Sequence, residues 1–294
     1  MSSAPVKILA VVVAFEPGAD VESNLAAIYP QVGRLVVVDN GSTDVAFVTA
    51  AAKQHPLLFI RNTENKGVAA ALNQAARIAL EEGYDWLATF DQDSLVPPGA
   101  IAEMMTLLER HPRRESIAII AMSHRDRGTS QDYHLRGDIL EETQEWREVR
   151  TTITSGALVR VSTLRALGLF DETLFIDSVD LEFCLRCRKN NLLVIESCKT
   201  VLAHSIGSAT EHKLLGRRLV CTNHSPLRRY YMTRNQLSVC CRYVLFDPFW
   251  ALRGLYHLLG SNVAVLLYED KKAAKMLAMI TGLAHFVLGR YGRR

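Results

Sequence analysis

Two carboxylates, Asp91 and Asp93, follow the apolar run 86–90 with one residue between them. If this run is a strand that ends at a sheet edge, its period-2 geometry points both side chains the same way. Such a pair can hold a divalent cation against a ligand's phosphates, because Mg²⁺ usually takes one or two carboxylates plus phosphate oxygens. Asp-x-Asp also occurs by chance in many proteins. The rest of the chain must therefore decide whether this pair is a metal site.

Two more polar turns follow apolar runs. The sequence Asp-Asn-Gly-Ser-Thr-Asp at 39–44 follows the run 35–38, and Asn-Lys-Gly at 65–67 precedes a helical pattern. A carboxylate can accept a hydrogen bond from a nucleobase or ribose, and a helix N-terminus favours phosphate. A plain Asn-Gly turn before a capped helix is the structural alternative for 39–44. Three polar strand ends at one sheet edge favour a ligand site, since open α/β sheets bind ligands there.

The elements that must position these turns alternate between strands and helices, which predicts an α/β fold with a mostly parallel central sheet and helices on both faces. The predicted strands are 8–15, 35–38, 57–60, 86–90, 117–122, 151–161, 192–195 and 201–204, and the predicted helices are 21–27, 45–53, 68–82, 100–110, 163–167 and 179–190. Residues 125–150 are polar, which predicts a segment that leaves the sheet and contains a hairpin. Beyond residue 248 the pattern is helical and apolar.

Charge is distributed unevenly along the chain. Residues 1–212 contain 20 Lys and Arg against 28 Asp and Glu, whereas residues 213–294 contain 14 against 3. The uncharged stretches 254–268 and 276–289 are shorter than the ~20 residues that a spanning helix needs. With basic residues around them, they predict amphipathic helices on a membrane surface; a helical cap or an oligomer interface is the alternative. No nucleic-acid-binding motif is present.

The composition of the 294 residues is that of a folded globular protein, with 49% hydrophobic and 22% charged residues. The six cysteines lack the spacing of a disulfide framework, which favours a reducing cytoplasm. Cys184-x-x-Cys187 lies in a helical pattern without a second pair, so we interpret it as packing. The N-terminus has no charged segment before an apolar run of signal type, and export is not expected.

As an ordered set, these motifs resemble family 2 glycosyltransferases with the GT-A fold. The matching segments are 11–15, 36–44, 65–73, 91–94, 154–157 and 175–186. The resemblance covers roughly residues 6–240. It implies a glycosyltransferase domain at 1–240, with a nucleotide-sugar-binding half (1–123) and an acceptor and catalytic half (124–240), before a basic helical region at 241–294.

Several motifs are similar to the rhamnosyltransferase subgroup, whose members use dTDP-L-rhamnose to build bacterial surface polysaccharides. They are Asp-Gln-Asp-Ser at 91–94, Phe-Ile-Asp-x-Val-Asp at 175–180, His-x-x-Gly at 204–207 and Arg-Tyr-Tyr-x-x-Arg-Asn at 229–235. The resemblance implies Mg²⁺ or Mn²⁺ on Asp91, Asp93 and His204. It implies nucleotide-sugar contacts from Phe15, Glu16, Asp39, Asn40, Asn65, Gly67, Asn73, Asp91, Gln92, Arg229 and Arg234, and acceptor contacts from Ser155, Gly156, Glu182, Tyr230 and Tyr231.

An inverting transfer needs one carboxylate to take the proton of the attacking acceptor hydroxyl. The family's base is the Asp of a Glu-Asp motif, which aligns here with Asp180. The usual Glu is replaced by Val179, so Asp177 is a second candidate for the role. The structural alternative is an acidic cluster at a helix start, which the helix dipole favours in any protein.

The resemblance thus predicts an inverting glycosyltransferase that moves a deoxyhexose, L-rhamnose, from a dTDP-sugar to a glycan or lipid-linked acceptor. It predicts a cytoplasmic enzyme on the inner membrane surface, with a homo-oligomer as an open alternative. A UDP- or GDP-sugar is the alternative donor. The alternatives from other functional classes are an inactive scaffold and a sugar-nucleotide pyrophosphorylase. The segment 15–20 lacks the Gly- and Arg-rich phosphate loop that a pyrophosphorylase requires.

Overall fold

The computed structural model describes residues 6–126, 138–204, 210–214 and 217–294, and no side chains at 125–126 or 203–220. The chain divides into two compact units. We call Met1–Asp171 with Phe183–Ser205 the sheet unit, and Glu172–Glu182 with Ile206–Arg294 the helical unit. The helical unit thus takes in both the loop before residue 183 and residues 206–240, whereas the sequence placed a boundary near residue 240.

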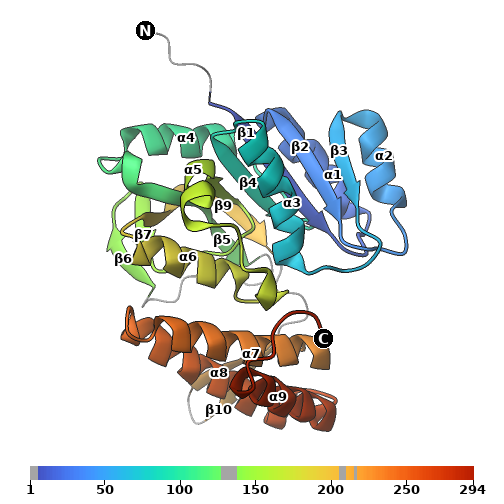
Figure 1. Ribbon diagram of the computed structural model, residues 1–294, viewed down its shortest axis with the longest axis vertical. Helices are drawn as coiled ribbons and strands as arrows, with labels where there is room; N and C mark the ends of the chain where they lie inside the picture. Colours follow the sequence, from blue (N-terminus) through green and yellow to red (C-terminus); the bar gives the residue numbers. More distant parts are fainter. Residues whose placement is uncertain (1–5, 127–137, 205–209, 215–216) are drawn as a thin grey trace. The chain divides into compact units, whose positions relative to one another are not determined.

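The sheet unit contains a nine-stranded sheet in the order β3-β2-β1-β4-β8-β5-β9-β7-β6 (Figure 1). β3, β2, β1 and β4 are parallel, β5 is parallel to β9, and β8 and the β6–β7 hairpin pair antiparallel. The predicted α/β fold is confirmed. The strands are β1 (Ile8–Ala14), β2 (Arg34–Asp39), β3 (Leu57–Arg61), β4 (Trp86–Asp91), β5 (Ile117–Asp126), β6 (Ile139–Glu142), β7 (Trp146–Val149), β8 (Ala157–Arg160) and β9 (Leu193–His204).

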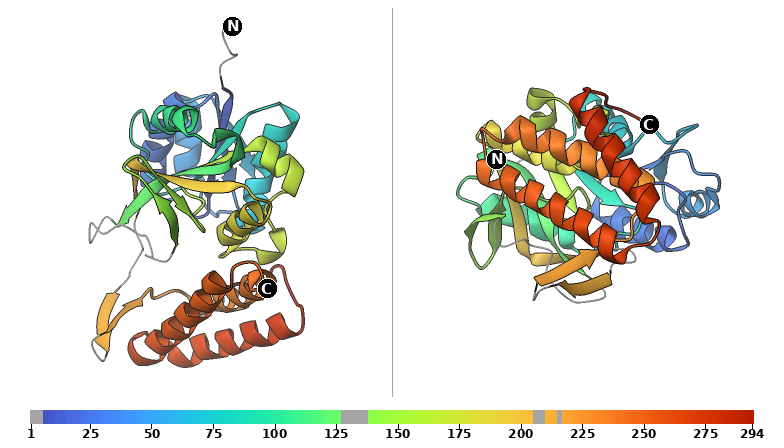
Figure 2. Two further views of the ribbon diagram at one scale, coloured as in Figure 1. Left: turned by 90° about the vertical axis from the view of Figure 1, so that its left-hand side faces the viewer. Right: turned by 90° about the horizontal axis from the view of Figure 1, so that it is seen from below.

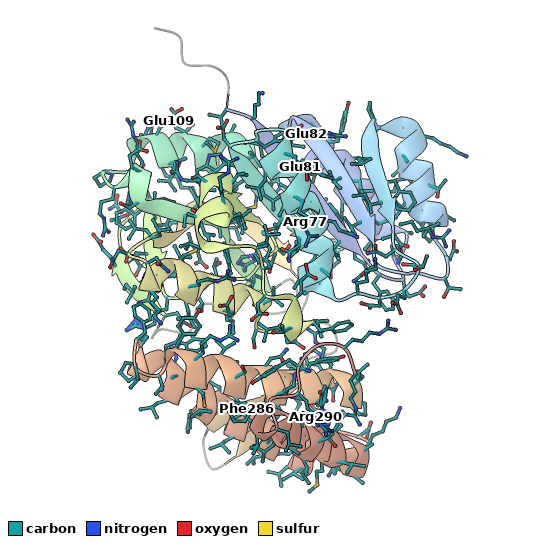
Figure 3. The ribbon with its side chains drawn as sticks, viewed as in Figure 1. Arg77, Glu81, Glu82, Glu109, Phe286 and Arg290 are labelled. Carbon is teal, nitrogen blue, oxygen red and sulfur yellow. The ribbon has the colours of Figure 1, made fainter. Side chains whose placement is uncertain are left out.

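Helices cover both faces of this sheet because successive strand residues point to opposite sides. One face of β1 packs with apolar residues of α1, α2 and α4 in a single core. α3 contacts β1, β2 and β4 from the other face, next to α5, with Arg77 and Glu81 on its exposed side (Figure 3). Glu82, just after the helix, pairs with Arg34 of β2. The helices are α1 (Asp20–Ile28), α2 (Ala46–Gln54), α3 (Val68–Glu81), α4 (Ala100–Arg110), α5 (Val161–Leu167) and α6 (Val179–Lys189).

Three predicted strands differ from the structure. The run 151–161 forms a strand only at β8, because residues 151–156 make the turn that ends at Gly156 with φ +76°. The runs 192–195 and 201–204 are parts of one strand, β9, interrupted by an irregularity. There the Ser197 hydroxyl accepts the N–H groups of Lys199 and Thr200, so the chain bulges without ending the strand.

The helical unit contains the pair β10 (Thr210–Leu214) and β11 (Arg217–Cys221), and the helices α7 (Pro226–Tyr243), α8 (Pro248–Tyr268) and α9 (Lys272–Val287). α7 packs on both other helices, and α8 and α9 form one layer in front of it in the view from below (Figure 2). The close approach of α9 to α7 needs Gly282, where a Cβ would lie 2.7 Å from the Tyr230 carbonyl oxygen. Within the described chain, no helix has the length and hydropathy to cross a bilayer.

Candidate active site

The loops after β1 and β2 are tied together through a buried carboxylate. Asp39 is fully buried at the end of β2 and accepts the hydroxyl and backbone N–H of Ser42. The Ser42 hydroxyl in turn accepts the N–H of Glu16 at 2.8 Å. The Glu16 carboxylate accepts both the N–H and the hydroxyl of Thr43, at 3.0 and 2.9 Å. Phe15, between β1 and this network, stays 46% exposed.

The loops after β2 and β3 are joined by side-chain amides. The Asn40 carbonyl oxygen accepts the Asn62 amide at 3.2 Å and the Lys66 N–H at 3.0 Å, and the Asn40 amide donates to Asn65 at 3.1 Å. Asn65 also accepts the N–H of Gly67, where α3 begins. A Cβ on Gly41 would lie 2.4 Å from the backbone of Glu64, so only glycine permits this contact.

The turn after β4 is fixed from three sides. The Gln92 side chain accepts the N–H of Phe15 at 2.8 Å, and its backbone carbonyl accepts the Asn24 amide. The Ser155 hydroxyl accepts the N–H of Asp91 at 3.2 Å and shares a hydrogen bond with the Ser94 hydroxyl. The four parallel strands therefore end in one hydrogen-bonded edge, which we call the loop edge.

The carboxylate pair at this edge offers oxygen ligands of the kind that a divalent cation takes. Asp91 ends β4 and is half-buried, while Asp93 is exposed, and no protein group in the described chain engages its carboxylate. Mg²⁺ needs one or two such carboxylates once substrate phosphates supply further oxygens. Among described side chains, no three His, Cys, Asp or Glu residues form a metal-binding cluster. His204 ends β9, but its side chain lies outside the description, so its metal role stays a prediction.

The helical unit contains a loop of unusual backbone geometry. Phe175, Asp177 and Ser178 have φ of +67°, +62° and +64°, a region that costs non-glycine residues energy. The Asn235 amide on α7 donates to the carbonyls of Leu174, Ile176 and Asp177 at 2.7, 2.7 and 3.1 Å. We call residues 174–178 the left-handed loop. One side chain thus satisfies three carbonyls of the strained segment.

Asp177 is the titratable group of this loop. One carboxylate oxygen, Oδ1, accepts two guanidinium N–H groups of Arg228, at 3.2 and 3.3 Å. The other oxygen, Oδ2, is buried without a hydrogen-bond partner in the described chain. Burial raises the pKa of the Asp177 carboxyl, and the Arg228 guanidinium opposes this shift. A carboxylate with one bonded and one unpartnered oxygen still has the capacity to accept a hydroxyl.

The two other acidic residues differ in exposure. Asp180 lies half-buried in the first turn of α6, where its Oδ1 accepts the N–H of Leu181 at 2.9 Å. Glu182 is buried and accepts the Tyr243 hydroxyl at 2.8 Å and Arg242 at 3.3 Å. Asp180 is therefore the more accessible carboxylate, whereas Glu182 anchors α7 to the helix start.

Four residues that the sequence assigned to ligands lie in the interior of the helical unit. Arg229 is 2% exposed and pairs with Glu269, which also binds Lys275 at 2.8 Å. Arg234 is 1% exposed and donates to the carbonyls of Thr173, Leu174 and Gly292. Tyr230 and Tyr231 belong to the core around Phe175 and Ala278. These contacts explain the Arg-Tyr-Tyr-x-x-Arg motif as structure of the helical unit.

Two predicted ligand residues of the sheet unit are also engaged by protein. Asn73 is buried in α3, where its amide exchanges two hydrogen bonds with the backbone of Phe170, at 2.9 and 3.0 Å. Gly156 lies against Met122 and Leu202, with no room for a side chain. Both residues are explained by packing that supports the loop edge.

Sequence reasoning missed three residues that build the loop edge: Asn24, Asn62 and His124. Asn62 directly follows β3, so the rule that found Asn65 could have found it too. His124, which bonds the Ser155 carbonyl at 2.7 Å, lies inside the long strand β5 and gave no signal. Asn24 lies on the buried side of α1, where only the fold reveals its partner.

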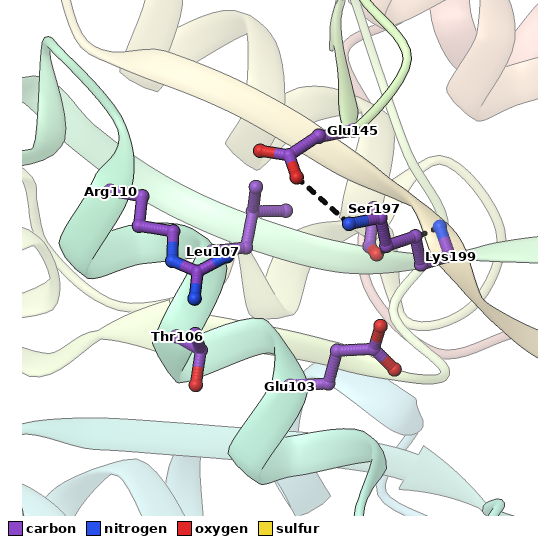
Figure 4. Close-up of a pocket in the computed structure, with 7 residues that line it drawn as sticks. All are labelled: Glu103, Thr106, Leu107, Arg110, Glu145, Ser197 and Lys199. Atoms are coloured by element: carbon purple, nitrogen blue, oxygen red, sulfur yellow. Dashed lines mark hydrogen bonds and ion pairs between the residues drawn. The ribbon is translucent and has the colours of Figure 1, made fainter.

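A small surface pocket of the sheet unit contains none of these residues. It is formed by α4, the β9 bulge and the turn before β7, and has a volume of about 140 Å³ (Figure 4). The ion pair of Lys199 with Glu145, 2.8 Å long, crosses it. Both carboxylates of the pocket lining are engaged by protein, since Glu145 pairs with Lys199 and Glu103 accepts the Thr200 hydroxyl at 3.4 Å. The loop edge therefore remains the candidate ligand site.

Sequence comparison shows which known proteins the chain resembles. Residues 13–168 match the family model described as glycosyl transferase family 2. Over 241 residues the chain is 32% identical to the dTDP-rhamnosyl transferase RfbF of Shigella flexneri, and the aligned region covers 78% of each chain.

Solved structures share the fold at low sequence identity. S. aureus TarS residues 1–349 in complex with UDP-GlcNAc superimposes with a TM-score of 0.60 at 14% identity, over 96% of this chain and 81% of that one. GalNAc-T7 with UDP, GalNAc and Mn²⁺ gives a TM-score of 0.55 at 12% identity, over 78% and 47%. Such identities show the fold alone.

Proposed function

The chain belongs to glycosyl transferase family 2 and is a glycosyltransferase, and on this premise we propose that it transfers L-rhamnose from a dTDP-sugar to a lipid-linked glycan with inversion. The observation that carries the proposal is the loop edge, where the ends of four parallel strands are fixed to one another by hydrogen bonds. Such preorganised loops suit a nucleotide diphosphate, because ligands of open α/β sheets bind at this edge. The name of the S. flexneri relative supports the choice of donor.

The donor contacts follow from the chemistry of each loop. Phe15 presents an exposed ring on which a base can stack, whereas Asp39, at the family's base-contacting position, is fully buried and holds the loop after β2 through Ser42. Gly67 begins α3, whose N-terminal N–H groups favour a phosphate. Asn40 and Asn65 hold the backbone of that turn and so keep those N–H groups oriented.

Asp91 and Asp93 would hold Mg²⁺ or Mn²⁺ at the diphosphate. A cation there would offset the charge that develops on the leaving nucleotide diphosphate. The protein's own part is to hold the turn that carries both carboxylates, through the Ser155 hydroxyl at the N–H of Asp91 and through the Gln92 side chain at the N–H of Phe15. The Mn²⁺ bound in GalNAc-T7 supports this proposal through the shared fold.

Asp180 takes the proton of the acceptor hydroxyl. Its place in the first turn of α6 and its partial exposure suit a base that must reach a ligand, and it aligns with the Asp of the family's Glu-Asp motif. Asp177, on the same segment, retains one carboxylate oxygen that is buried and has no hydrogen-bond partner among the described residues. We propose that Asp180 is the base and that Asp177 binds the acceptor.

The helical unit binds the inner membrane surface. α8 exposes an apolar stripe at three- and four-residue spacing, and α9 exposes a second one: Phe249, Leu252, Tyr256, Leu259, Val263 and Leu266, then Met276, Leu277, Ile280, Leu283 and Val287. Exposed Lys271, Lys272, Arg290, Arg293 and Arg294 accompany them, with Arg290 just after α9 (Figure 3). Apolar stripes flanked by basic residues suit an anionic bilayer.

Donor specificity tests the activity. Purified protein with Mn²⁺ or Mg²⁺ is incubated with dTDP-L-rhamnose, UDP-GlcNAc or a GDP-sugar, and release of the nucleotide diphosphate is measured with and without octyl glycosides as acceptors. We expect turnover and thermal stabilisation with dTDP-L-rhamnose above the other donors, since a selective ligand stabilises the folded state. Preference for a UDP- or GDP-sugar would overturn the donor, and no turnover of any donor would overturn the activity.

Vesicle binding tests the membrane surface. We expect the protein to float with vesicles of phosphatidylglycerol and phosphatidylcholine, and Leu259→Glu with Ile280→Glu to abolish flotation. The control is Phe47→Glu with Leu140→Glu, which adds the same two charges at exposed apolar residues of α2 and β6. A wild-type protein that dimerises through this stripe and ignores vesicles would show an oligomer interface instead.

A further inference from the structure

The left-handed loop has a conformation that its own residues do not favour. Phe175, Asp177 and Ser178 carry side chains at φ values where glycine is the usual residue. No glycine occurs between residues 169 and 206, so the conformation must be imposed by contacts. Strained backbone of this kind persists only where surrounding structure over-determines it.

The contacts come from two neighbouring residues of α7. Asn235 is fully buried and donates its amide to three loop carbonyls. Its own Oδ1 accepts Nε of Arg234 at 2.9 Å, which fixes which end of the amide faces the loop. Arg234 also donates to the carbonyls of Thr173 and Leu174, each at 3.2 Å. Carbonyls before and within the loop are thus held by one turn of α7.

The loop in turn places a carboxylate whose two oxygens have different environments. Oδ1 of Asp177 is bonded to Arg228, whereas Oδ2 is buried and has no hydrogen-bond partner among the described residues. A buried oxygen without a partner costs folding energy, which a bound hydroxyl donor would recover. Since Asp180 follows three residues later, a change in the loop also moves the start of α6.

We propose that Asn235 is a positioning residue for the acceptor: it holds the left-handed loop so that Oδ2 of Asp177 accepts a hydrogen bond from an acceptor hydroxyl. The proposal rests on the glycosyl transfer proposed above. Asn235 itself touches no substrate. Its effect is on the acceptor step, so donor binding at the loop edge does not depend on it.

The test replaces only the donor groups of the amide. Asn235→Asp keeps the shape and the acceptor for Arg234 but removes the N–H groups that face the loop carbonyls. We expect kcat/KM for an octyl glycoside acceptor to fall about 100-fold, because small misplacements of catalytic groups have such effects, with KM for the donor nearly unchanged. The control, Asn190→Asp, makes the same chemical change where the amide bonds only the Arg186 carbonyl, and should transfer normally.

A second variant separates positioning from stability. Ser178→Gly relieves the strain, so we expect an equal or higher melting temperature together with a lower kcat, since the loop now samples other conformations. A purely structural loop would give a higher melting temperature at unchanged kcat, and that result would overturn the proposal. Transfer by Asn235→Asp at the wild-type rate would also overturn it.

Hydrogen exchange distinguishes failure of this proposal from failure of the proposed function. Amides 175–178 should exchange at least about 10-fold faster in Asn235→Asp than in wild type, because opening of a local unit controls exchange. Unchanged exchange overturns the positioning role whether or not the protein transfers sugar. If amides 175–178 exchange faster in Asn235→Asp but the wild-type protein turns over no donor, the positioning role of Asn235 is supported and the glycosyl transfer is overturned.

Discussion

The loop edge and the left-handed loop reach positive φ by opposite means. At the loop edge Gly41 and Gly67 have φ of +89° and +88°, which strains the backbone of a glycine little. The side chains of the neighbouring residues bond one another there. In the left-handed loop, residues with side chains adopt φ near +65° and one turn of α7 holds them. The first arrangement is built by local sequence, and the second is imposed by a helix about 60 residues away.

This difference separates the two roles. A donor site that binds phosphate through backbone N–H groups needs glycine where chains approach closely. A carboxylate that must be fixed with one oxygen open needs a rigid support, and that support has an energetic cost. We therefore expect substitutions in the left-handed loop segment to reduce turnover, and substitutions at the loop edge to reduce donor binding and stability.

The largest expected effect is on the base. Asp180→Asn should lower kcat for transfer about 1,000-fold, within the range for loss of a general base, while the donor still stabilises the protein. Asp177→Asn should raise KM for the acceptor more than it lowers kcat, because an amide oxygen still accepts the hydroxyl. The measurement is steady-state transfer with donor and acceptor varied in turn. Near-normal transfer by Asp180→Asn with loss in Asp177→Asn would exchange the two roles.

A smaller effect is expected from filling the glycine contact at the loop edge. Gly41→Ala should destabilise the sheet unit by about 3 kcal/mol, since it adds left-handed strain and a clash with the backbone of Glu64. The control, Gly83→Ala, has a similar φ of +69° but open space around the added Cβ, so it should cost only the strain. Urea unfolding of both variants gives the difference, and equal losses would show that the contact is loose.

The sequence predicted the loop edge because its rule is local. Polar residues directly after apolar runs end parallel strands, and this placed Asp39, Asn65 and Asp91 at one edge of a sheet that the structure confirms. The parallel pairing of the first four strands follows from the same alternation of strands and helices, whereas their order does not. Asn62 obeys the rule as well and was simply overlooked.

The helical unit could not be predicted in the same way. Arg229, Arg234, Tyr230 and Tyr231 have the residue types of a phosphate or sugar site, and only long-range packing shows that they are internal. The partner of Arg229 is Glu269, 40 positions along the chain, and no periodicity encodes that pair. The strain at Phe175–Ser178 is equally invisible, because nothing in the segment predicts left-handed backbone.

A still smaller effect is expected at the carboxylate pair. Asp93→Asn should lower kcat/KM about 10- to 100-fold and raise the Mn²⁺ concentration for half-maximal turnover, since an amide is a weaker ligand for a hard cation. Asp93 is exposed, so the melting temperature should not change. The control is Glu64→Gln, a neutralised carboxylate in the next loop. Equal metal dependence in wild type and Asp93→Asn would exclude Asp93 as a ligand.

The smallest effect concerns a buried carboxyl of the sheet unit that neither loop uses. Burial raises the pKa of Glu196 to about 8, opposed by the Thr152 hydroxyl and Arg147, with Asp138 adding to the rise. The unfolded chain releases this proton near pH 4.5, so the free energy of unfolding should fall between about pH 4.5 and 8 and level off above.

Glu196→Gln isolates this contribution, because glutamine can still accept the Thr152 hydroxyl but does not ionise. The variant should be more stable than wild type by about 1–3 kcal/mol at pH 9 and nearly equal at pH 5, measured by urea unfolding. Glu141→Gln on the exposed strand β6 should change neither value. A pH-independent difference would mean that Glu196 remains ionised in the folded protein. In that case the sheet unit would hold a buried charge in place.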